Sequence, residues 1–482
     1  MSSQSHPSGE TAPPSDETAP PSDETASPVA DPLLTRVAAG LDWPTWESWQ
    51  DRAAPSPPAS AESTDAAASA EAVDATQRAG EVRRRLALAR TVDEGGPWLE
   101  LFEDDVAERL AAETDTVSGP LAMDTFAIKA LLAVEGRRTE AGSPVRVDAP
   151  VETATAPIVE RLRAAGATAL GTVTLHEFAF GVTGVNAHAG TAPNPAAPDR
   201  VPGGSSSGSA SSVADGSASF AIGTDTGGSV RIPSAFCGIA GFKPAHGTYP
   251  ADGVFPLSTT LDHVGFHAPT VADLTRVHTA LGYSTATPPQ QLRIGVARSD
   301  VEAADDEVRH AIETAIDRLA AAGASVVDVG WPDAEQTFVA STGIMFSEAA
   351  AIHAAQLAAH ADRYGADIRT RLEMGAALTG PQVAAAHRLR SQLIAEVEAT
   401  LAGVDVIVSP TVPIVAPLLV DAADPALAPR IVANTRLGNV VGLPAVTLPA
   451  PTDGAPVGLQ LLGPTNAPTL ACALWAEGVL AG

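Results

Sequence analysis

Two loops rich in glycine and serine are the part of the chain best suited to chemistry. The first reads Gly203-Gly204-Ser205-Ser206-Ser207-Gly208-Ser209, and the second reads Asp225-Thr226-Gly227-Gly228-Ser229-Val230-Arg231. Such runs are costly to order unless the backbone itself has a task. They lie between segments that we expect in the core, so a flexible linker between domains does not explain them. We interpret them as parts of a site.

Several familiar motifs do not fit these loops. A phosphate-binding loop needs a lysine directly after a glycine, and neither lysine of the chain has one before it. A Ser-x-x-Lys pair fails because Phe126 and Ala240 stand where the serine would have to be. The nucleophile elbow G-x-S-x-G matches formally around Ser206, but no apolar strand precedes it. Metal-binding spacings such as His-Glu-x-x-His and Cys-x-x-Cys are absent from the sequence.

A serine nucleophile with a lysine base remains. Of the 29 basic residues, all but Lys129 and Lys243 are arginine. This bias is either chance in an arginine-rich chain or a sign that one site needs an amine that loses its proton near neutral pH, which arginine cannot do. The Gly227-Gly228 turn offers unshielded backbone N–H groups to an oxyanion, and Ser229 ends that turn. A buried, neutral Lys129 is the available base, with a second hydroxyl from the first loop as a bridge.

Further segments extend the pattern along the chain. They are Gly119-Pro120-Leu121 with Ile128-Lys129, Asn194-Pro195, Arg200-Val201-Pro202, Cys237-Gly238-Ile239-Ala240-Gly241-Phe242-Lys243-Pro244, Pro256-Leu257-Ser258 with Leu261-Asp262, Ser409-Pro410-Thr411, Asn434-Thr435, Gly442-Leu443-Pro444-Ala445 and Pro456-Val457-Gly458-Leu459-Gln460. Together with the two loops, and in this order, they resemble the amidase signature family of Ser–cis-Ser–Lys hydrolases. The resemblance is strong over residues 117–270 and weaker over 340–465.

This resemblance implies a role for each matching residue. It makes Ser229 the nucleophile, Ser205 the bridge that enters through a cis Gly204–Ser205 peptide, and Lys129 the base. The oxyanion donors that it implies are the backbone N–H groups of Thr226, Gly227, Gly228 and Ser229. Ala130 follows the lysine where the family usually has aspartate. That departure concerns the tuning of the lysine pKa rather than its identity.

The activity implied is an amidase that hydrolyses the C–N bond of a linear carboxamide through an acyl-enzyme on Ser229. The alternative is the glutaminase (A-type) subunit of a tRNA-dependent amidotransferase. A binding module without catalysis is a third interpretation, against which the intact Lys129, Ser205 and Ser229 speak. We expect Asp225 and Arg231 to hold the loop together rather than to touch substrate. Structural roles are also expected for Lys243, Cys237, His176 and His188.

Helical and strand patterns alternate after the first 76 residues and predict an α/β fold. The expected helices are 79–91, 98–113, 152–165, 304–322, 334–361 and 380–402, and the expected strands are 167–174, 219–223, 292–297, 325–329, 404–408, 445–448 and 458–462. We predict one large catalytic domain at 77–482, with a central mixed β-sheet covered by helices. Before it we expect a disordered, acidic, proline-rich tail at 1–28. A short helical segment with Trp43, Trp46 and Trp49, followed by a flexible linker, would fill 29–76.

Charge limits the partners. The formal net charge is −28, and the densest basic run, Arg83-Arg84-Arg85 with Arg90, is interrupted by apolar residues. Nucleic acid and anionic membranes are therefore not expected as direct partners. Two cysteines and no signal-peptide-like or membrane-spanning stretch favour a cytoplasmic protein. We expect a small-molecule amide as substrate, no cofactor and no metal, and, from the resemblance alone, a homodimer.

Overall fold

The computed structural model describes residues 73–91, 96–112 and 116–481. The tail predicted at 1–28 and residues 29–72 lie outside the described residues. Strand β1 (Val73–Asp74) and helix α2 (Ala75–Thr91) open the described part, so ordered structure begins before Gln77. β1 pairs antiparallel with β3 (Thr116–Val117).

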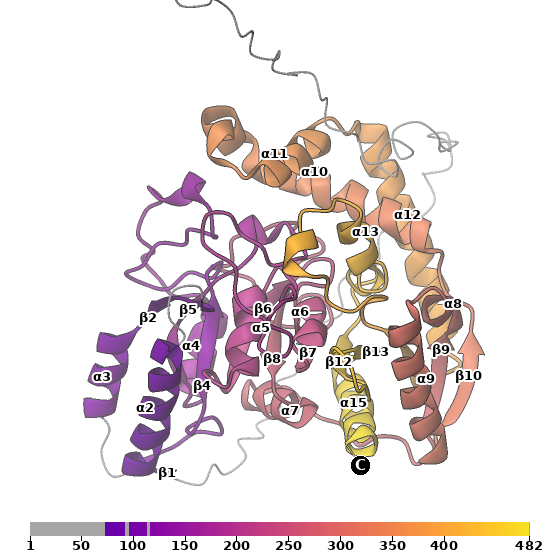
Figure 1. Cartoon of the computed structure of the whole chain (residues 1–482), viewed down its shortest axis with the longest axis horizontal. Coiled ribbons are helices and arrows are strands. Elements are labelled where there is room, and N and C mark those ends of the chain that lie inside the picture. Colours follow the sequence, from indigo (N-terminus) through magenta and orange to yellow (C-terminus); the bar gives the residue numbers. More distant parts are fainter. Residues whose placement is uncertain (1–72, 92–95, 113–115, 482) are drawn as a thin grey trace, which may run out of the picture. The chain divides into compact units, whose positions relative to one another are not determined.

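A mixed sheet of 11 strands forms the centre of the described residues, as the sequence predicted (Figure 1). Antiparallel pairs fill the middle, and parallel pairs lie on either side of it. At one end the edge strand Trp98–Leu101 pairs antiparallel with Thr168–Val173. In order across the sheet the strands are β10 (Ser325–Val329), β9 (Arg293–Ala297), β11 (Val406–Pro410), β13 (Gly458–Leu462), β12 (Ala445–Pro449), β7 (Ala240–Lys243), β8 (His263–Ala268), β6 (Phe220–Asp225), β4 (Thr125–Lys129), β5 (Thr168–Val173) and β2 (Trp98–Leu101).

Helices surround this sheet. They are α3 (Glu103–Ala112), α4 (Pro157–Ala164), α5 (Ser207–Ala214), α6 (Arg231–Phe236), α7 (Val271–Ala280), α8 (Arg298–Glu302), α9 (Asp306–Ala321), α10 (Ala334–His360), α11 (Ala366–Ala376), α12 (Gly380–Leu401), α13 (Leu427–Ile431), α14 (Arg436–Val440) and α15 (Asn466–Leu480). Short 3-10 turns lie at Pro144–Arg146, Glu177–Ala179, Ala361–Arg363 and Leu419–Asp421.

Strand alternation shows that both faces of the sheet are covered. Ala221 of β6 packs in one cluster with Ala127 of β4 and Ala210 of α5. The next residue of β6 points to the opposite face, where its partner Phe266 lies beside Phe242 of β7. Phe242 contacts His278 of α7, with ring centroids 5.5 Å apart. α5 and α7 therefore cover opposite faces of the central strands.

Two predicted elements were wrong in part, and others were missed. The helix expected at 152–165 is α4, which begins only at Pro157. The range 98–113 was expected to be a single helix, but Trp98–Leu101 forms the edge strand β2 and only Glu103–Ala112 is helical. Strand β4 was not predicted, because it is buried on both faces and so shows no polar–apolar alternation. The helices predicted at 304–322, 334–361 and 380–402 are confirmed as α9, α10 and α12.

The longest helix is α10, which the Asp333 side chain caps by accepting a hydrogen bond from the Gln336 N–H at 3.0 Å. Within the described residues it is the one helix long and apolar enough to cross a membrane by length and composition. Most of that stretch is buried, and the helix packs against α11, α12 and α14. These contacts are those of a core helix.

Candidate active site

Two neighbouring parallel strands bring the candidate residues to one edge of the sheet. β4 and β6 pair in parallel, with Ile128 opposite Ile222, so their carboxyl ends lie side by side. Lys129 is the last residue of β4, and the second glycine–serine loop begins at Asp225, the last residue of β6. The first loop leads directly into α5, which packs on both strands. Residues far apart in sequence thus meet at this edge.

Lys129 is completely buried, and its hydrogen-bond partners are hydroxyl groups. Its Nζ lies 2.8 Å from Ser205 Oγ and 2.7 Å from Thr224 Oγ1. Burial lowers the pKa of Lys129 to about 7, against the opposing influence of the Asp262 and Asp225 carboxylates. Near neutral pH a large share of the molecules therefore carries an uncharged amine here. With one N–H directed at Thr224, the nitrogen lone pair can accept the Ser205 proton.

The first loop is anchored through its backbone. The Gly204–Ser205 peptide is cis, as the resemblance implied. The Ser205 carbonyl accepts a hydrogen bond from the His176 N–H at 3.0 Å, and the Ser206 N–H donates to the Ser229 carbonyl at 3.3 Å. The latter contact joins the two loops directly. Ser229 itself is 5 % exposed, at the end of the turn.

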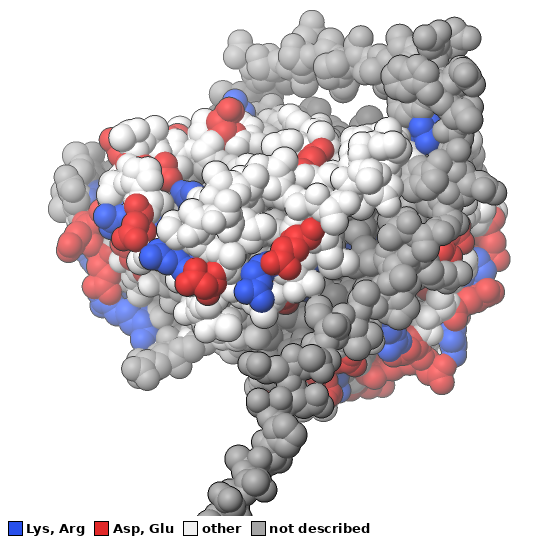
Figure 2. Space-filling model, turned by 90° about the horizontal axis from the view of Figure 1, so that it is seen from above, with Lys and Arg blue, Asp and Glu red and all other residues white. Residues whose placement is uncertain are grey.

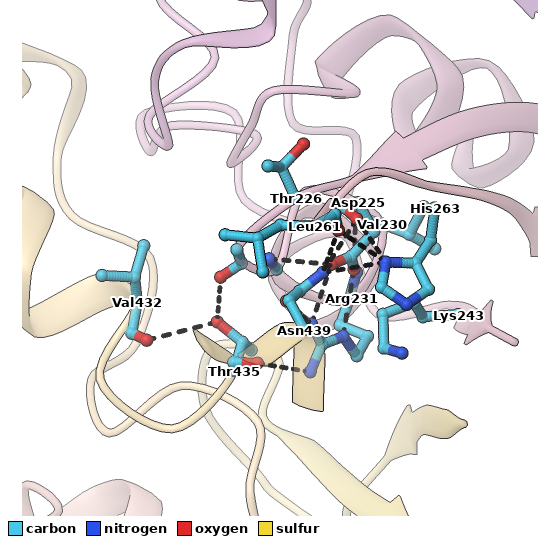
Figure 3. A network of polar contacts seen from close by, with 12 residues as sticks. Asp225, Thr226, Val230, Arg231, Lys243, Leu261, His263, Val432, Thr435 and Asn439 are labelled. Carbon is cyan, nitrogen blue, oxygen red and sulfur yellow. Dashed lines mark hydrogen bonds and ion pairs between the residues drawn. The ribbon is translucent and has the colours of Figure 1, made fainter. Parts of the chain in front are cut away.

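Asp225 holds the second loop in shape (Figure 3). Its carboxylate accepts hydrogen bonds from the N–H groups of Gly228 at 2.9 Å and Val230 at 3.1 Å. Asn439 of α14 donates from Nδ2 both to the carboxylate and to the backbone carbonyl of Asp225, each at 2.8 Å. The chain between Asp225 and Ser229 is thereby bent around one buried carboxylate.

Arg231 pairs with that carboxylate in a fully buried ion pair. Its Nε and Nη2 lie 3.0 and 2.8 Å from the Asp225 oxygens. The remaining donors reach the Thr435 carbonyl, Gln460 Oε1 and Asn439 Oδ1 at 2.7 to 2.8 Å. Although burial alone would raise it, the guanidinium holds the pKa of Asp225 well below its usual range. The predicted structural role of both residues is confirmed.

Gly228 requires one correction to the expected set of oxyanion donors. Its φ of 130° suits glycine, and a Cβ here would lie 2.2 Å from Thr435 Oγ1. The same conformation turns the Gly228 N–H onto Asp225 Oδ1, so this amide is already occupied. Among the described residues, the N–H groups of Thr226, Gly227 and Ser229 donate to no other group. These three remain as candidate donors.

Sequence reasoning missed three residues that complete the site: Thr224, Asp262 and Asn439. Thr224 is the second partner of Lys129, and a hydroxyl directly after four apolar residues of a buried strand was its signal. Asp262 Oδ1 accepts from Thr226 Oγ1 at 2.6 Å. Asn439 lies 214 positions after Asp225 in the chain, and only the folded structure brings them together.

The remaining candidates have structural surroundings. Lys243 is buried and donates to the carbonyls of Pro244 and Leu443 at 3.0 and 2.5 Å. The Cys237 thiol is buried, which raises its pKa. His176 Nε2 lies 3.4 Å from Asp367 of α11, and His188 lies 3.8 Å from Glu177. The contact between His176 and Asp367 places α11 against the loop whose His176 N–H bonds the Ser205 carbonyl. Helix α11 lies in the region where the sequence resemblance is weaker.

Comparison with known proteins is consistent with this geometry. A family model described as Amidase matches residues 89–469. The chain belongs to the amidase family. Its fold is also that of a solved structure titled "Crystal structure of amidase", with a TM-score of 0.77 and 32% identity over 84% of this chain and 96% of that one.

Two relatives of this amidase-family chain have different names. The A-type subunit of glutamyl-tRNA(Gln) amidotransferase from Halobacterium salinarum is 34% identical over 72% of this chain and 92% of its own length. A 2-amino-5-chloromuconic acid deaminase of Comamonas testosteroni is 36% identical over 75% of this chain and 83% of its own. The family is thus settled, while the names of its members diverge.

Proposed function

We propose that this amidase-family protein hydrolyses a small linear carboxamide to a carboxylate and an amine or ammonia, with Ser229 as nucleophile, Ser205 as bridge and Lys129 as base. The observation that carries the proposal is the buried Lys129 amine, 2.8 Å from Ser205 Oγ, with a pKa of about 7. A group that titrates near the working pH is the most effective general base.

In the first half-reaction, Ser229 Oγ attacks the amide carbonyl carbon. Its proton passes to Ser205, and the Ser205 proton passes to the Lys129 lone pair. The oxyanion accepts hydrogen bonds from the N–H groups of Thr226, Gly227 and Ser229. The C–N bond then breaks as Lys129, through Ser205, returns the proton to the leaving nitrogen. The product of this half-reaction is an acyl ester on Ser229.

In the second half-reaction, water attacks the ester carbonyl. Ser205 and Lys129 take the water proton by the same relay and deliver it to Ser229 Oγ as the ester bond breaks. The carboxylate leaves, and the serine is restored. The same donors serve both tetrahedral intermediates, since both oxyanions occupy one position.

Removing the nucleophile tests this assignment. Ser229→Ala should abolish amide hydrolysis while the unfolding midpoint changes little. Ser207→Ala is the matched control, because this buried hydroxyl of the first loop has no hydrogen-bond partner among the described residues. Incubating the native protein with a panel of amides and measuring its mass should show an adduct that Ser229→Ala lacks. Undiminished turnover by Ser229→Ala would overturn the assignment.

Substrate choice would depend on the walls of the site. The loop after His176 meets α11 through Asp367, and Arg371 of α11 donates to the Phe180 carbonyl. Phe180 in turn packs against Phe346 of α10, with ring centroids 5.0 Å apart. We therefore assign specificity to this junction of the 176–190 loop with α10 and α11. The amides accepted in the mass panel would define the class of substrate.

The second candidate function is that of a glutaminase subunit in a tRNA-dependent amidotransferase. It is favoured by relatives with that name, such as the Halobacterium salinarum protein. The net charge of −28 counts against close contact with tRNA. On the face shown in Figure 2, described basic side chains lie mostly beside acidic ones and form no basic field. A glutaminase assay on the chain alone and with co-purified partner chains separates the two: activity only in a complex would favour the amidotransferase role.

We also propose that the protein acts in the cytoplasm and as a homodimer, without direct contact with nucleic acid or membrane. The acidic composition supports the absence of anionic partners. Size-exclusion chromatography with light scattering would test the dimer.

A further inference from the structure

Asp262 lies in the loop before β8 and faces residues 226–229, the nucleophile turn that ends in Ser229. Its Oδ1 accepts the hydrogen bond from Thr226 Oγ1 at 2.6 Å. Its Oδ2 accepts from the N–H groups of Leu257 and Ser258 at 2.9 and 3.0 Å. Every one of these donors is neutral. The carboxylate therefore fixes Thr226, the first residue of the nucleophile turn. None of these donors carries a positive charge that would balance the carboxylate.

A cavity of about 390 Å³ is lined both by this carboxylate and by a direct partner of Lys129. Both Asp262 and Thr224 line it, and Thr224 is the hydroxyl that bonds Lys129 Nζ at 2.7 Å. The Asp262 and Asp225 carboxylates both favour the protonated form of the buried amine. The charge of Asp225 is already balanced by Arg231 at 2.8 Å. Among the described residues, Asp262 has no such counter-charge.

We propose that Asp262 is a positioning residue for the acyl-transfer site, which fixes Thr226 in the nucleophile turn and, through its negative charge, sets the pH at which Lys129 becomes a base. The inference rests on the proposed role of Lys129.

The other titratable groups around the pair act differently. His246 and His263 line the same cavity, and burial lowers the pKa of each. Burial lowers the pKa of His176 and lowers that of His267 to about 3, so both rings are neutral near pH 7. Glu348 of α10 accepts hydrogen bonds from Ser258 Oγ and Thr260 Oγ1, each at 2.7 Å, and so holds the loop that carries Asp262. Burial, with Glu348 nearby, raises the pKa of Asp262 to about 6. The Asp262 charge is thus in place as Lys129 loses its proton.

The scarcity of lysine makes a direct test practical. In protein labelled with ¹³C at the lysine ε carbon, Lys129 and Lys243 give the only two signals, and Lys129→Met identifies the first of them. Following that signal with pH measures the Lys129 titration midpoint without any substrate. This readout does not depend on catalysis, so it separates the present inference from the proposed function.

Removing the charge should lower the midpoint. In Asp262→Asn we expect the Lys129 midpoint to fall by about one pH unit, because an opposing charge no longer favours the protonated amine. The acidic limb of the amide-hydrolysis profile should move the same way. Asp262→Glu, which keeps the charge, should titrate near the native midpoint. Asp252→Asn is the matched control, the same change at an exposed aspartate of the nearby loop, and should leave the midpoint unchanged.

If Asp262→Asn does not fold, the Lys129 titration midpoint in Thr226→Val tests the role of Asp262 instead. Losing the Thr226 hydroxyl removes a hydrogen bond that lowers the Asp262 pKa, so less negative charge is present near pH 7 and the Lys129 midpoint should again fall, by a smaller amount. A Lys129 midpoint in folded Asp262→Asn, or failing that in Thr226→Val, equal to the native one overturns the inference. Amide hydrolysis by Lys129→Met at the native rate would instead overturn the proposed function.

Discussion

Lys129 and Arg231 are two basic side chains with no exposed surface, at the same edge of the sheet, and their surroundings differ in kind. Arg231 meets a carboxylate and three further acceptors, which together hold the guanidinium in place. Lys129 meets two hydroxyl groups, and burial lowers its pKa to about 7. Equal burial therefore produces a fixed structural cation in one case and a titrating base in the other. At equal depth, the type of side chain and its partner groups together separate structure from chemistry: a guanidinium cannot lose its proton, whereas a buried amine with neutral partners can.

Replacing Lys129, the titrating side chain of the two, should have the largest effect on catalytic activity. Lys129→Met should lower amide turnover by at least about 100-fold, the usual contribution of a general base. Lys243→Met is the matched control, because among the described residues the second lysine bonds only backbone carbonyls and lies outside the proposed relay. Turnover measured on the best amide of the panel checks this. A Lys129→Met protein as active as Lys243→Met would remove the distinction.

Breaking the fixed ion pair should instead affect stability. Asp225→Asn leaves the buried Arg231 charge without its partner, which typically costs about 3–5 kcal/mol of unfolding free energy. Denaturant unfolding at pH 7 measures it. Because the pKa of Asp225 is held low, its contribution is fully present at that pH and is lost only in strong acid. An unchanged midpoint would show that the pair does not hold the loop.

Lys129→Met should have the opposite effect on stability. Between pH 7 and the usual lysine pKa of 10.5, the unfolded chain binds a proton that the native lysine does not, so native stability rises with pH across this window. Methionine removes that cost. The variant should be more stable than the native protein by on the order of a few kcal/mol at pH 7, and the gain should disappear toward pH 10.5. A gain that is independent of pH would refute this reading.

A smaller effect should follow from the second hydroxyl partner of the lysine. Thr224→Val removes the acceptor 2.7 Å from Lys129 Nζ and leaves one N–H without a partner. The lone pair is then less well directed at Ser205. We expect turnover to fall about 10-fold, since one buried hydrogen bond contributes about 1–1.5 kcal/mol. Thr224→Ser, which keeps the hydroxyl, should recover most of the loss; if it does not, packing rather than the hydrogen bond is responsible.

The sequence predicted the side chains that are proposed to react better than the residues that position them. Ser205 and Ser229 stand in loops whose glycine and serine content has no packing explanation, and Lys129 is one of two lysines in the chain. The structure brings Lys129 to Ser205 as expected. The mixed sheet was also predicted, because alternating helix and strand patterns survive in most of the chain.

The positioning residues could not be predicted because their contacts depend on packing between segments far apart in the sequence. Asn439 and Thr435 reach the nucleophile turn from a helical segment more than 200 positions later, and neither has a local pattern that reveals the contact. The Gly228 amide was misjudged for the same reason. Its orientation toward Asp225 is a property of the folded turn rather than of residue types.

The protonation state of Lys129 in the native chain is the central requirement of the proposed mechanism. Titration of the ¹³Cε signal of Lys129, assigned with Lys129→Met and compared with Lys243 in the same sample, measures it. We predict a midpoint of about 7. A midpoint near 10.5, the usual lysine value, would mean a charged amine at the site and would contradict the proposed base.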